Sequence, residues 1–208
     1  IVLRSKSHAT VEDVARHSAC SVINGLTDRS HPCQALADLF TLAEVFGELA
    51  GRKLAWVGDA NNVARSLVYA CGRLGVSIAV AAPKAYHFDP AEVEQMRAAC
   101  PDLSLLITDD PQEAVDGAAA VYTDVWASMG QEKEQAQRRR DFAAFQVNAK
   151  LLRAAPEDIR FMHCLPAKRG EEVTDDVIDS PASIVVQQAA NRMHVQKGVL
   201  LWLLATRP

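Results

Sequence analysis

The stretch KLAWVGDANNVARSLVYACGRLGVSIAVAA (residues 53–82) decides the fold. It begins and ends with continuously apolar runs, KLAWVG and SIAVAA, which are typical of strands buried on both faces. Between them, VARSLVYACGRL has a helical pattern, and Gly75 follows it where a helix end favours a residue that tolerates positive φ. A strand, a helix and a second strand in this order predict a parallel βαβ unit.

The same alternation of short apolar runs and longer helical patterns extends over most of the chain. We therefore expect an α/β fold with parallel sheets flanked by helices. A boundary is predicted in FGELAGRK (46–53), where two glycines separate a long helix from a strand. The further strand candidates are IVLR (1–4), SVIN (21–24), LSLLIT (103–108), AAVYTD (119–124) and IRFMHC (159–164).

Composition limits the classes of partner and compartment. The 208 residues carry a formal net charge of -4, and no Lys/Arg stripe alternates with aromatic residues, so we expect no nucleic-acid partner. Five cysteines lie far apart without a C-x-x-C pair, which argues against a disulfide framework and a zinc site and favours a reducing, cytoplasmic compartment. The longest apolar stretch, GVLLWLLA (198–205), is too short to cross a bilayer, so we expect no membrane span.

The first motif with chemical potential is SHPCQALADLFTLAEVFG (30–47). Ser30 is expected to cap a helix and Pro32 to occupy its first turn. His31 and Gln34 would then lie at the exposed helix N-terminus, where free N–H groups attract an anion or a carbonyl oxygen. The alternative is a helix start with no ligand.

The second motif, WVGDANNVARSLV (56–68), places the end of a buried strand next to a helix that begins near Asn62. Open α/β sheets bind ligands at this position. The fingerprint G-x-G-x-x-G is absent, which argues against a nucleotide-binding dehydrogenase. The amides of Asn61 and Asn62 suit a small zwitterion instead, although either could serve only as a helix cap.

The third motif, YTDVWASMGQEKE (122–134), ends a strand at Asp124 and continues into a small loop with Ser128 and Met129. A carboxylate at a strand end can bind an ammonium group, and a hydroxyl can assist it. The charged run QEKEQAQRRR (131–140) is expected to be a solvated, mobile segment, which would suit a lid beside a ligand.

The fourth motif is FMHCLPAKRGEE, in which Cys164 follows a buried strand at the mouth of a loop. Lys168 and Arg169 are expected to lower the pKa of its thiol, whereas the alternative is an inert core cysteine. A Cys-His protease is disfavoured because His163 and Cys164 are adjacent on a strand and point to opposite faces. Downstream, Arg192 near the start of the last helix is either a surface residue or a further ligand group.

Five motifs in register, HPCQALADLFTL, WVGDANN, TDVWASMG, HCLPA and NRMHVQKGVL, resemble the aspartate/ornithine carbamoyltransferase family over essentially the whole chain. The S-M-G loop and H-C-L-P are similar to the ornithine branch. The resemblance implies three parts. These are the C-terminal part of a carbamoyl-phosphate-binding domain (1–48), a Rossmann-like ornithine-binding domain (49–186) and a C-terminal helix packed back on the first domain (187–208).

The resemblance also implies a reaction and its residues. The reaction is carbamoyl transfer from carbamoyl phosphate to the side-chain amine of ornithine, giving citrulline and phosphate in arginine biosynthesis, without a metal or organic cofactor. Cys164, His31 and Arg192 would be catalytic. The residues implied for carbamoyl phosphate are Arg4, His31, Gln34, Cys164, Leu165 and Arg192. The residues implied for ornithine are Asn62, Asp124, Ser128 and Met129.

Departures from the family pattern set further expectations. The family carries an S-x-R-T-R phosphate loop and a further histidine before H-P-x-Q, and this sequence contains neither, so we expect a fragment that binds carbamoyl phosphate poorly and turns over negligibly. Family members are typically homotrimers. Alternatives are a carbamoyltransferase for putrescine or an acylornithine, and a catalytically inactive ligand-binding or assembly module.

Overall fold

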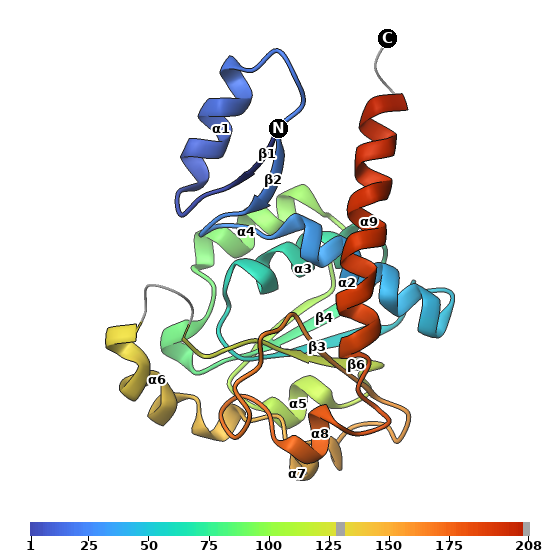
Figure 1. Cartoon of the computed structure of the whole chain (residues 1–208). Helices are drawn as coiled ribbons and strands as arrows, with labels where there is room; N and C mark the ends of the chain where they lie inside the picture. Colours follow the sequence, from blue (N-terminus) through green and yellow to red (C-terminus); the bar gives the residue numbers. More distant parts are fainter. Residues whose placement is uncertain (128–131, 206–208) are drawn as a thin grey trace.

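Two parallel sheets form the framework of the protein, which is described by a computed structural model over residues 1–127 and 132–205 (Figure 1). The five-stranded sheet has the order β5-β4-β3-β6-β7, and β1 and β2 form a separate two-stranded sheet. The expected α/β class is confirmed, although the second strand begins at Ile23 rather than Ser21. The strands are β1 Val2–Arg4, β2 Ile23–Leu26, β3 Lys53–Val57, β4 Ser77–Ala81, β5 Leu105–Thr108, β6 Ala120–Thr123 and β7 Arg160–His163.

Helices cover both faces of the five-stranded sheet (Figure 1). Along β3, Leu54 and Trp56 pack in one apolar cluster with residues of α2, α3 and α4. Ala55 and Val57 pack in the other with residues of α5, α7 and α8. The helices are α1 His8–His17, α2 Pro32–Phe46, α3 Asn62–Arg73, α4 Pro90–Ala99, α5 Pro111–Val115, α6 Gln135–Asp141, α7 Ala149–Leu152, α8 Asp175–Ile178 and α9 Val185–Ala205, with short 3-10 turns η1 Lys84–Tyr86, η2 Glu132–Glu134 and η3 Ala143–Phe145.

Burial on both faces explains why the strands are continuously apolar rather than alternating. Each fully buried Leu or Val side chain contributes about 1.5–3 kcal/mol relative to its exposed state. Across the sheet, the rings of Trp56 and Tyr122 stack with centroids 5.0 Å apart. This contact joins β3 to β6 next to the strand ends that carry the polar motifs.

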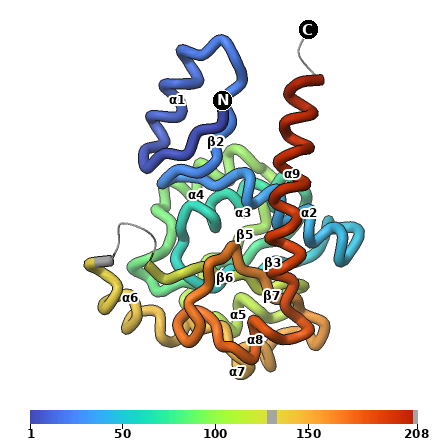
Figure 2. The backbone as a smooth tube through the Cα atoms, viewed as in Figure 1, coloured from blue at the N-terminus to red at the C-terminus, as the bar shows by residue number. Residues whose placement is uncertain are grey.

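The last helix joins the end of the chain to its beginning. α9 runs beside α2 in both views (Figures 1 and 2), and Asn191 Nδ2 donates to Thr41 Oγ1 at 3.0 Å. Gly47, with a φ of 74°, ends α2 and donates its N–H to the carbonyl of Ala43. The domain boundary expected in the following segment stays a prediction.

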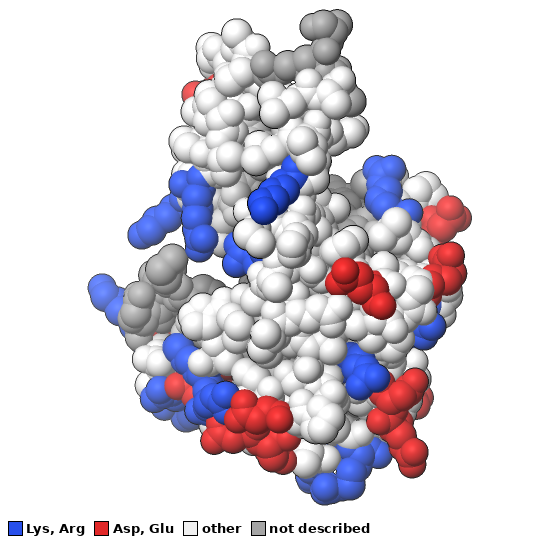
Figure 3. All heavy atoms as spheres, turned by 45° about the vertical axis from the view of Figure 1, so that its right-hand side comes forward, with Lys and Arg blue, Asp and Glu red and all other residues white. Residues whose placement is uncertain are grey.

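The surface carries mixed charges. On the face that Figure 3 shows, acidic and basic side chains lie side by side over the lower part of the molecule, and the upper, projecting part consists mainly of other residues. None of the helices within residues 1–127 and 132–205 is long and apolar enough to cross a membrane.

Candidate functional site

Three strand ends converge on the carboxylate of Asp124. Parallel strands bring their carboxyl ends to one edge of the sheet, so the segments after β3, β6 and β7 meet there. Asp124 Oδ1 accepts a hydrogen bond from Cys164 Sγ at 3.0 Å and another from the Val125 N–H at 2.8 Å. Asp124 Oδ2 accepts from Asn61 Nδ2 at 2.9 Å. The structure thus brings together Asp124 and Cys164, two residues that the motifs singled out separately.

The Cys164 thiol is a hydrogen-bond donor in this arrangement. Burial raises the pKa of Cys164 well above its ordinary value, and the neighbouring Asp124 carboxylate raises it further. The expectation that Lys168 and Arg169 lower this pKa is therefore wrong. Arg169 instead pairs with Asp179 on the surface, at 2.8 Å between Nη2 and Oδ1.

The loop after β7 is held by His163 and Glu172, which are both fully buried. His163 Nδ1 accepts a hydrogen bond from the Leu165 N–H at 2.8 Å, so Nε2 carries the proton and lies 3.2 Å from Glu172 Oε1. Leu165 has a φ of 56°, in the left-handed region that is costly for a residue with a branched side chain. The loop is thus held in one conformation, and both ring nitrogens of His163 bond to groups other than the Cys164 thiol. No hydrogen-bonded Cys-His pair therefore forms among these described groups, as expected. One ring nitrogen nevertheless lies within 4.8 Å of the Cys164 sulfur, so the expectation that the two side chains point to opposite faces is wrong.

Within residues 1–127 and 132–205, one group of side chains could geometrically hold a metal ion. Asp124, His163 and Cys164 each offer a ligand atom, and these atoms lie within 4.8 Å of one another. Each is already hydrogen-bonded in the structure, and the thiol would have to lose its proton to bind a metal. Cys164 thus bonds to Asp124, and His163 bonds separately to Glu172 and the Leu165 N–H.

The N-terminus of α2 differs from the expectation. His31 rather than Ser30 occupies the N-cap position, and its backbone N–H donates to Ser66 Oγ of α3 at 2.8 Å. His31 is 5% exposed and Gln34 0% exposed, so the prediction that both lie on an exposed helix end is wrong. The physical reason is that α3 packs over this end of α2.

Charge and burial determine the state of His31. Burial lowers the pKa of His31 to about 4, and the nearby guanidinium groups of Arg192 and Arg4 contribute to the shift. The imidazole is therefore neutral at pH 7. Among the described residues, no group bonds to its Nδ1. His31, Arg192 and Arg4 thus form a second cluster, positively charged but with a neutral imidazole at its centre.

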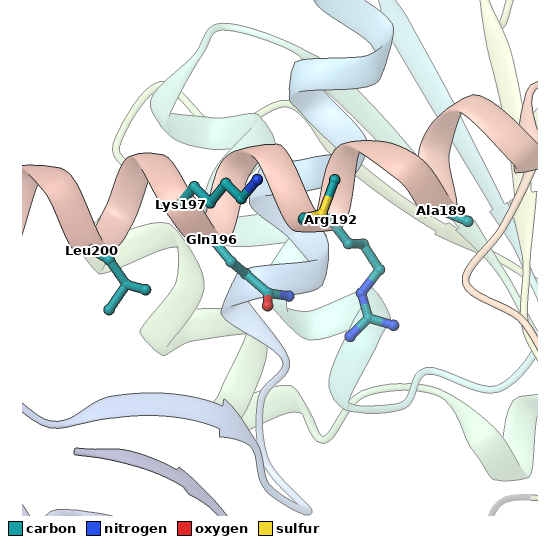
Figure 4. Close-up of a pocket in the computed structure, with 6 residues that line it drawn as sticks. Ala189, Arg192, Gln196, Lys197 and Leu200 are labelled. Atoms are coloured by element: carbon teal, nitrogen blue, oxygen red, sulfur yellow. The ribbon is translucent and has the colours of Figure 1, made fainter.

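An open pocket of about 450 Å³ lies beside α9. Arg192, Gln196 and Leu200 project from the same side of this helix (Figure 4). Within the part of the chain that the structure describes, Arg192 Nε is buried without a hydrogen-bond partner. The lining residues are Ala189, Arg192, Met193, Gln196, Lys197 and Leu200.

The other predicted residues have different surroundings. Asn62 Nδ2 donates to the Thr27 carbonyl at 2.7 Å, so Asn61 and not Asn62 contacts Asp124 directly. Leu165 is 39% exposed at the loop mouth. Ser128 and Met129 lie outside the described residues.

Sequence reasoning missed several buried charged residues, among them Arg138, Asp38 and Glu172. Arg138, in the run predicted to be solvated and mobile, is 6% exposed and donates to Asp59 Oδ2 at 2.7 Å and to the Trp126 carbonyl at 3.0 Å. The predicted solvation is therefore wrong for Arg138, whereas most of the other described residues of this run are exposed. Only the spacing of Glu134 and Arg138 hinted at a pair. Asp38 is fully buried in α2, and its position within the apolar run ALADLF was the available signal.

Comparisons with known proteins connect this geometry to a family. Residues 50–203 match "Aspartate/ornithine carbamoyltransferase, Asp/Orn binding domain", and residues 1–44 match the carbamoyl-P binding domain of the same family. An ornithine carbamoyltransferase from Anoxybacillus flavithermus is 50% identical over 206 residues, which are 98% of this chain and 66% of the relative. One from Thermococcus kodakarensis is 52% identical over 202 residues, 96% of this chain and 64% of the relative.

Solved structures give the same result. The ornithine carbamoyltransferase from Pyrococcus furiosus has a TM-score of 0.95 and 49% identity, with 100% of this chain and 67% of that chain covered. The enzyme from Thermus thermophilus has a TM-score of 0.87 and 47% identity, with 98% and 66% covered. The chain thus spans about two thirds of the length of the relatives that it matches.

Proposed function

The chain belongs to the aspartate/ornithine carbamoyltransferase family, and from this premise we propose that the protein transfers the carbamoyl group of carbamoyl phosphate to the side-chain amine of L-ornithine. The products are L-citrulline and phosphate. The observation that carries the proposal is the hydrogen bond from Cys164 to Asp124 at the edge of the sheet. It places a neutral thiol and a carboxylate where an amino acid with a second amine can be held.

The amino-acid half of the site has to deliver a neutral amine. Such amines titrate near pH 10 in water, so desolvation must favour the uncharged form. The protonated thiol of Cys164 adds no negative charge that would retain the ammonium form. Asp124 and Asn62 orient the amino acid, with Ser128 and Met129 completing its binding site.

The carbamoyl half has to stabilise negative charge on the carbamoyl oxygen. Arg4 and the neutral His31 donate to this oxygen, and Arg192 binds the phosphate. The amine nitrogen bonds to the carbamoyl carbon, the bond from that carbon to the phosphate oxygen breaks, and its electron pair leaves with the phosphate. The proton lost by the nitrogen also goes to the phosphate. Cys164 and the Leu165 backbone border the reacting carbon.

Calorimetric titration of the chain with L-ornithine and norvaline tests the amino-acid half. We expect both to bind, and putrescine and N-acetylornithine to bind more weakly because each lacks a charged group that Asp124 or Asn62 would hold. Asp124→Asn should weaken ornithine binding at least tenfold, since a charge-assisted hydrogen bond contributes roughly 1.5–3 kcal/mol. Binding of none of these compounds would refute the proposal, and equal binding of putrescine would favour a different amine substrate.

Citrulline formation is the second readout. We expect no more than a negligible residual rate from these 208 residues, because they contain no S-x-R-T-R phosphate loop. Cys164→Ala should lower the rate further while ornithine still binds. Citrulline formation at a normal rate by this chain would contradict the expectation about the phosphate loop and support the activity.

Assembly and cellular context follow from the same proposal. We expect a homotrimer because the family resemblance implies one. Exposed apolar side chains on α2 and α9, among them Leu36, Phe40 and Leu201, also favour association. Sedimentation analysis of the chain tests this expectation. We also place the reaction in arginine biosynthesis, as the family resemblance implies. We place it in the cytoplasm because scattered cysteines fit a reducing compartment.

A further inference from the structure

Asp38 is a buried carboxylate that contacts side chains from both ends of the chain. We propose that Asp38 is a positioning residue that orients the Gln34 amide for the carbamoyl group and connects it, through Gln188, to the strand that carries Cys164. The inference rests on the proposed carbamoyl transfer.

Hydrogen bonds define the network around Asp38. Its Oδ1 accepts from Gln34 Nε2 at 2.8 Å, within α2, and from Gln188 Nε2 of α9 at 2.7 Å. Gln188 Oε1 in turn accepts from the backbone N–H of His163, the last residue of β7, at 3.0 Å. Asp38, Gln34 and Gln188 are at most 1% exposed. Asp38 Oδ1 thus links α2 directly to α9, and Gln188 extends this link to β7.

The chemistry of this network determines which way each amide faces. Both glutamines direct their NH2 groups toward Asp38 Oδ1 and their oxygens away from it. This oxygen can accept hydrogen bonds whether the carboxyl group is ionised or carries its proton on Oδ2. For Gln188 the bond from the His163 N–H supports this orientation independently. For Gln34 the oxygen is left, within the described part of the chain, as a buried acceptor without a partner.

A buried acceptor without a partner is costly unless a ligand satisfies it. The carbamoyl group carries an NH2, and its oxygen is already assigned to Arg4 and His31. The Gln34 oxygen therefore suits the carbamoyl NH2.

The surroundings of Asp38 argue against a role in stability alone. Burial raises the pKa of Asp38 to about 7, although the hydrogen bonds from the two glutamines and the charge of Arg192 each lower it. A hydrogen bond from Tyr122 also lowers the pKa of Asp38, and Cys71 and Cys164 lie close enough to it for electrostatic interaction. None of these three groups supplies a positive charge. Burying a carboxyl group without an ion pair costs free energy. The presence of this carboxyl group in an apolar run is explained if Asp38 orients Gln34.

Two substitutions separate orientation from packing. Asp38→Asn keeps an oxygen that accepts from both glutamines, whereas Asp38→Leu fills a similar volume and accepts from neither. We expect Asp38→Leu to weaken carbamoyl phosphate binding, measured by calorimetry, about tenfold or more, and Asp38→Asn to stay within about threefold. Thr41→Val is the matched control, because Thr41 is buried on the same helix and bonds to α9 without contacting Gln34, and its binding should be unchanged.

A double-mutant cycle tests whether Asp38 acts through Gln34. In a Gln34→Ala background, Asp38→Leu should cause no further loss of affinity, because the amide to be oriented is gone. An equal loss in both backgrounds would overturn the inference and leave Asp38 with a packing role.

A ligand-free readout keeps the inference separate from the proposed function. The readout is the side-chain NH2 signals of Gln34 and Gln188 in nitrogen NMR spectra at pH 6. Each signal is assigned by its loss in Gln34→Ala or Gln188→Ala. Both signals should shift in Asp38→Leu and remain near their original positions in Asp38→Asn. If carbamoyl phosphate binding by the unmodified chain is too weak to measure, the missing S-x-R-T-R loop accounts for it, and these signals still decide whether Asp38 orients Gln34. Unchanged signals in Asp38→Leu would overturn the inference.

Discussion

Replacing Asp38 by Asn should change how the stability of the protein depends on pH. Burial raises the pKa of Asp38 from 3.8 to about 7 in the folded state. Between these values the folded state holds a proton that the unfolded state has released. Stability from this group is therefore fully present below pH 3.8 and decreases as the pH rises through 7. Asn cannot ionise, so the variant lacks this decrease.

The magnitude follows from the difference in pKa. A shift of roughly 3 units at about 1.36 kcal/mol per unit corresponds to about 4 kcal/mol over the whole range. Between pH 5 and pH 8 the portion lost is about 3 kcal/mol, because part of the unfolded-state titration lies below pH 5. Going from pH 5 to pH 8, the free energy of unfolding of Asp38→Asn should therefore rise by about 3 kcal/mol relative to that of the original chain.

Urea denaturation at pH 5 and pH 8 measures this difference. Subtracting the two proteins at each pH cancels the contributions of all other titrating groups, provided that the slopes of unfolding free energy against urea agree. Thr41→Val serves again as the control, since it removes a buried hydroxyl without a titrating group and should follow the pH dependence of the original chain. A stability difference between the original chain and the Asp38→Asn variant that stays constant within about 1 kcal/mol would refute the argument that Asp38 titrates near neutrality.

Three further outcomes are expected. Arg138→Met should lower the free energy of unfolding by about 3–5 kcal/mol, because it leaves a partly buried carboxylate without its cation; a loss below about 1 kcal/mol in urea denaturation would contradict the role of this pair. His31 should titrate near pH 4 in NMR spectra, and Arg192→Gln should raise that pKa, since it removes a nearby positive charge; titration at the ordinary value near 6.5 would argue against a neutral, buried imidazole. Cys164 should react slowly with iodoacetamide at pH 8, and Asp124→Asn should accelerate the reaction by removing the negative charge that raises the thiol pKa, as followed by mass spectrometry of the peptide that contains it. A rate equal to that of the unfolded chain would contradict the raised pKa.

Local sequence was enough to predict the framework. The apolar runs that became β3, β4 and β6 are buried on both faces, and this environment leaves a direct record in the residue types. Gly75 was predicted to follow a helix because its backbone conformation, with a φ of 66°, is accessible to few other residues. The same logic placed Asp124 and Cys164 at strand ends, and parallel topology brought those ends together.

The polar details could not be obtained in this way, because they depend on residues far apart in the sequence. Asp38 and Gln188 are 150 positions apart and share a hydrogen bond of 2.7 Å. Arg138 was expected in solvent, yet it pairs with Asp59, 79 positions earlier. No local pattern records such partners.

Sequence by itself thus determined the strand and helix order and the strand-end positions of the site, since local apolarity and backbone freedom set both. Tertiary structure alone decided which groups are buried and therefore in which state they act. Desolvation keeps the Cys164 thiol protonated and His31 neutral, against the exposed surroundings that the motifs suggested for both. The cost of transferring a charge out of water depends on everything packed around it, and that packing exists only in the folded chain.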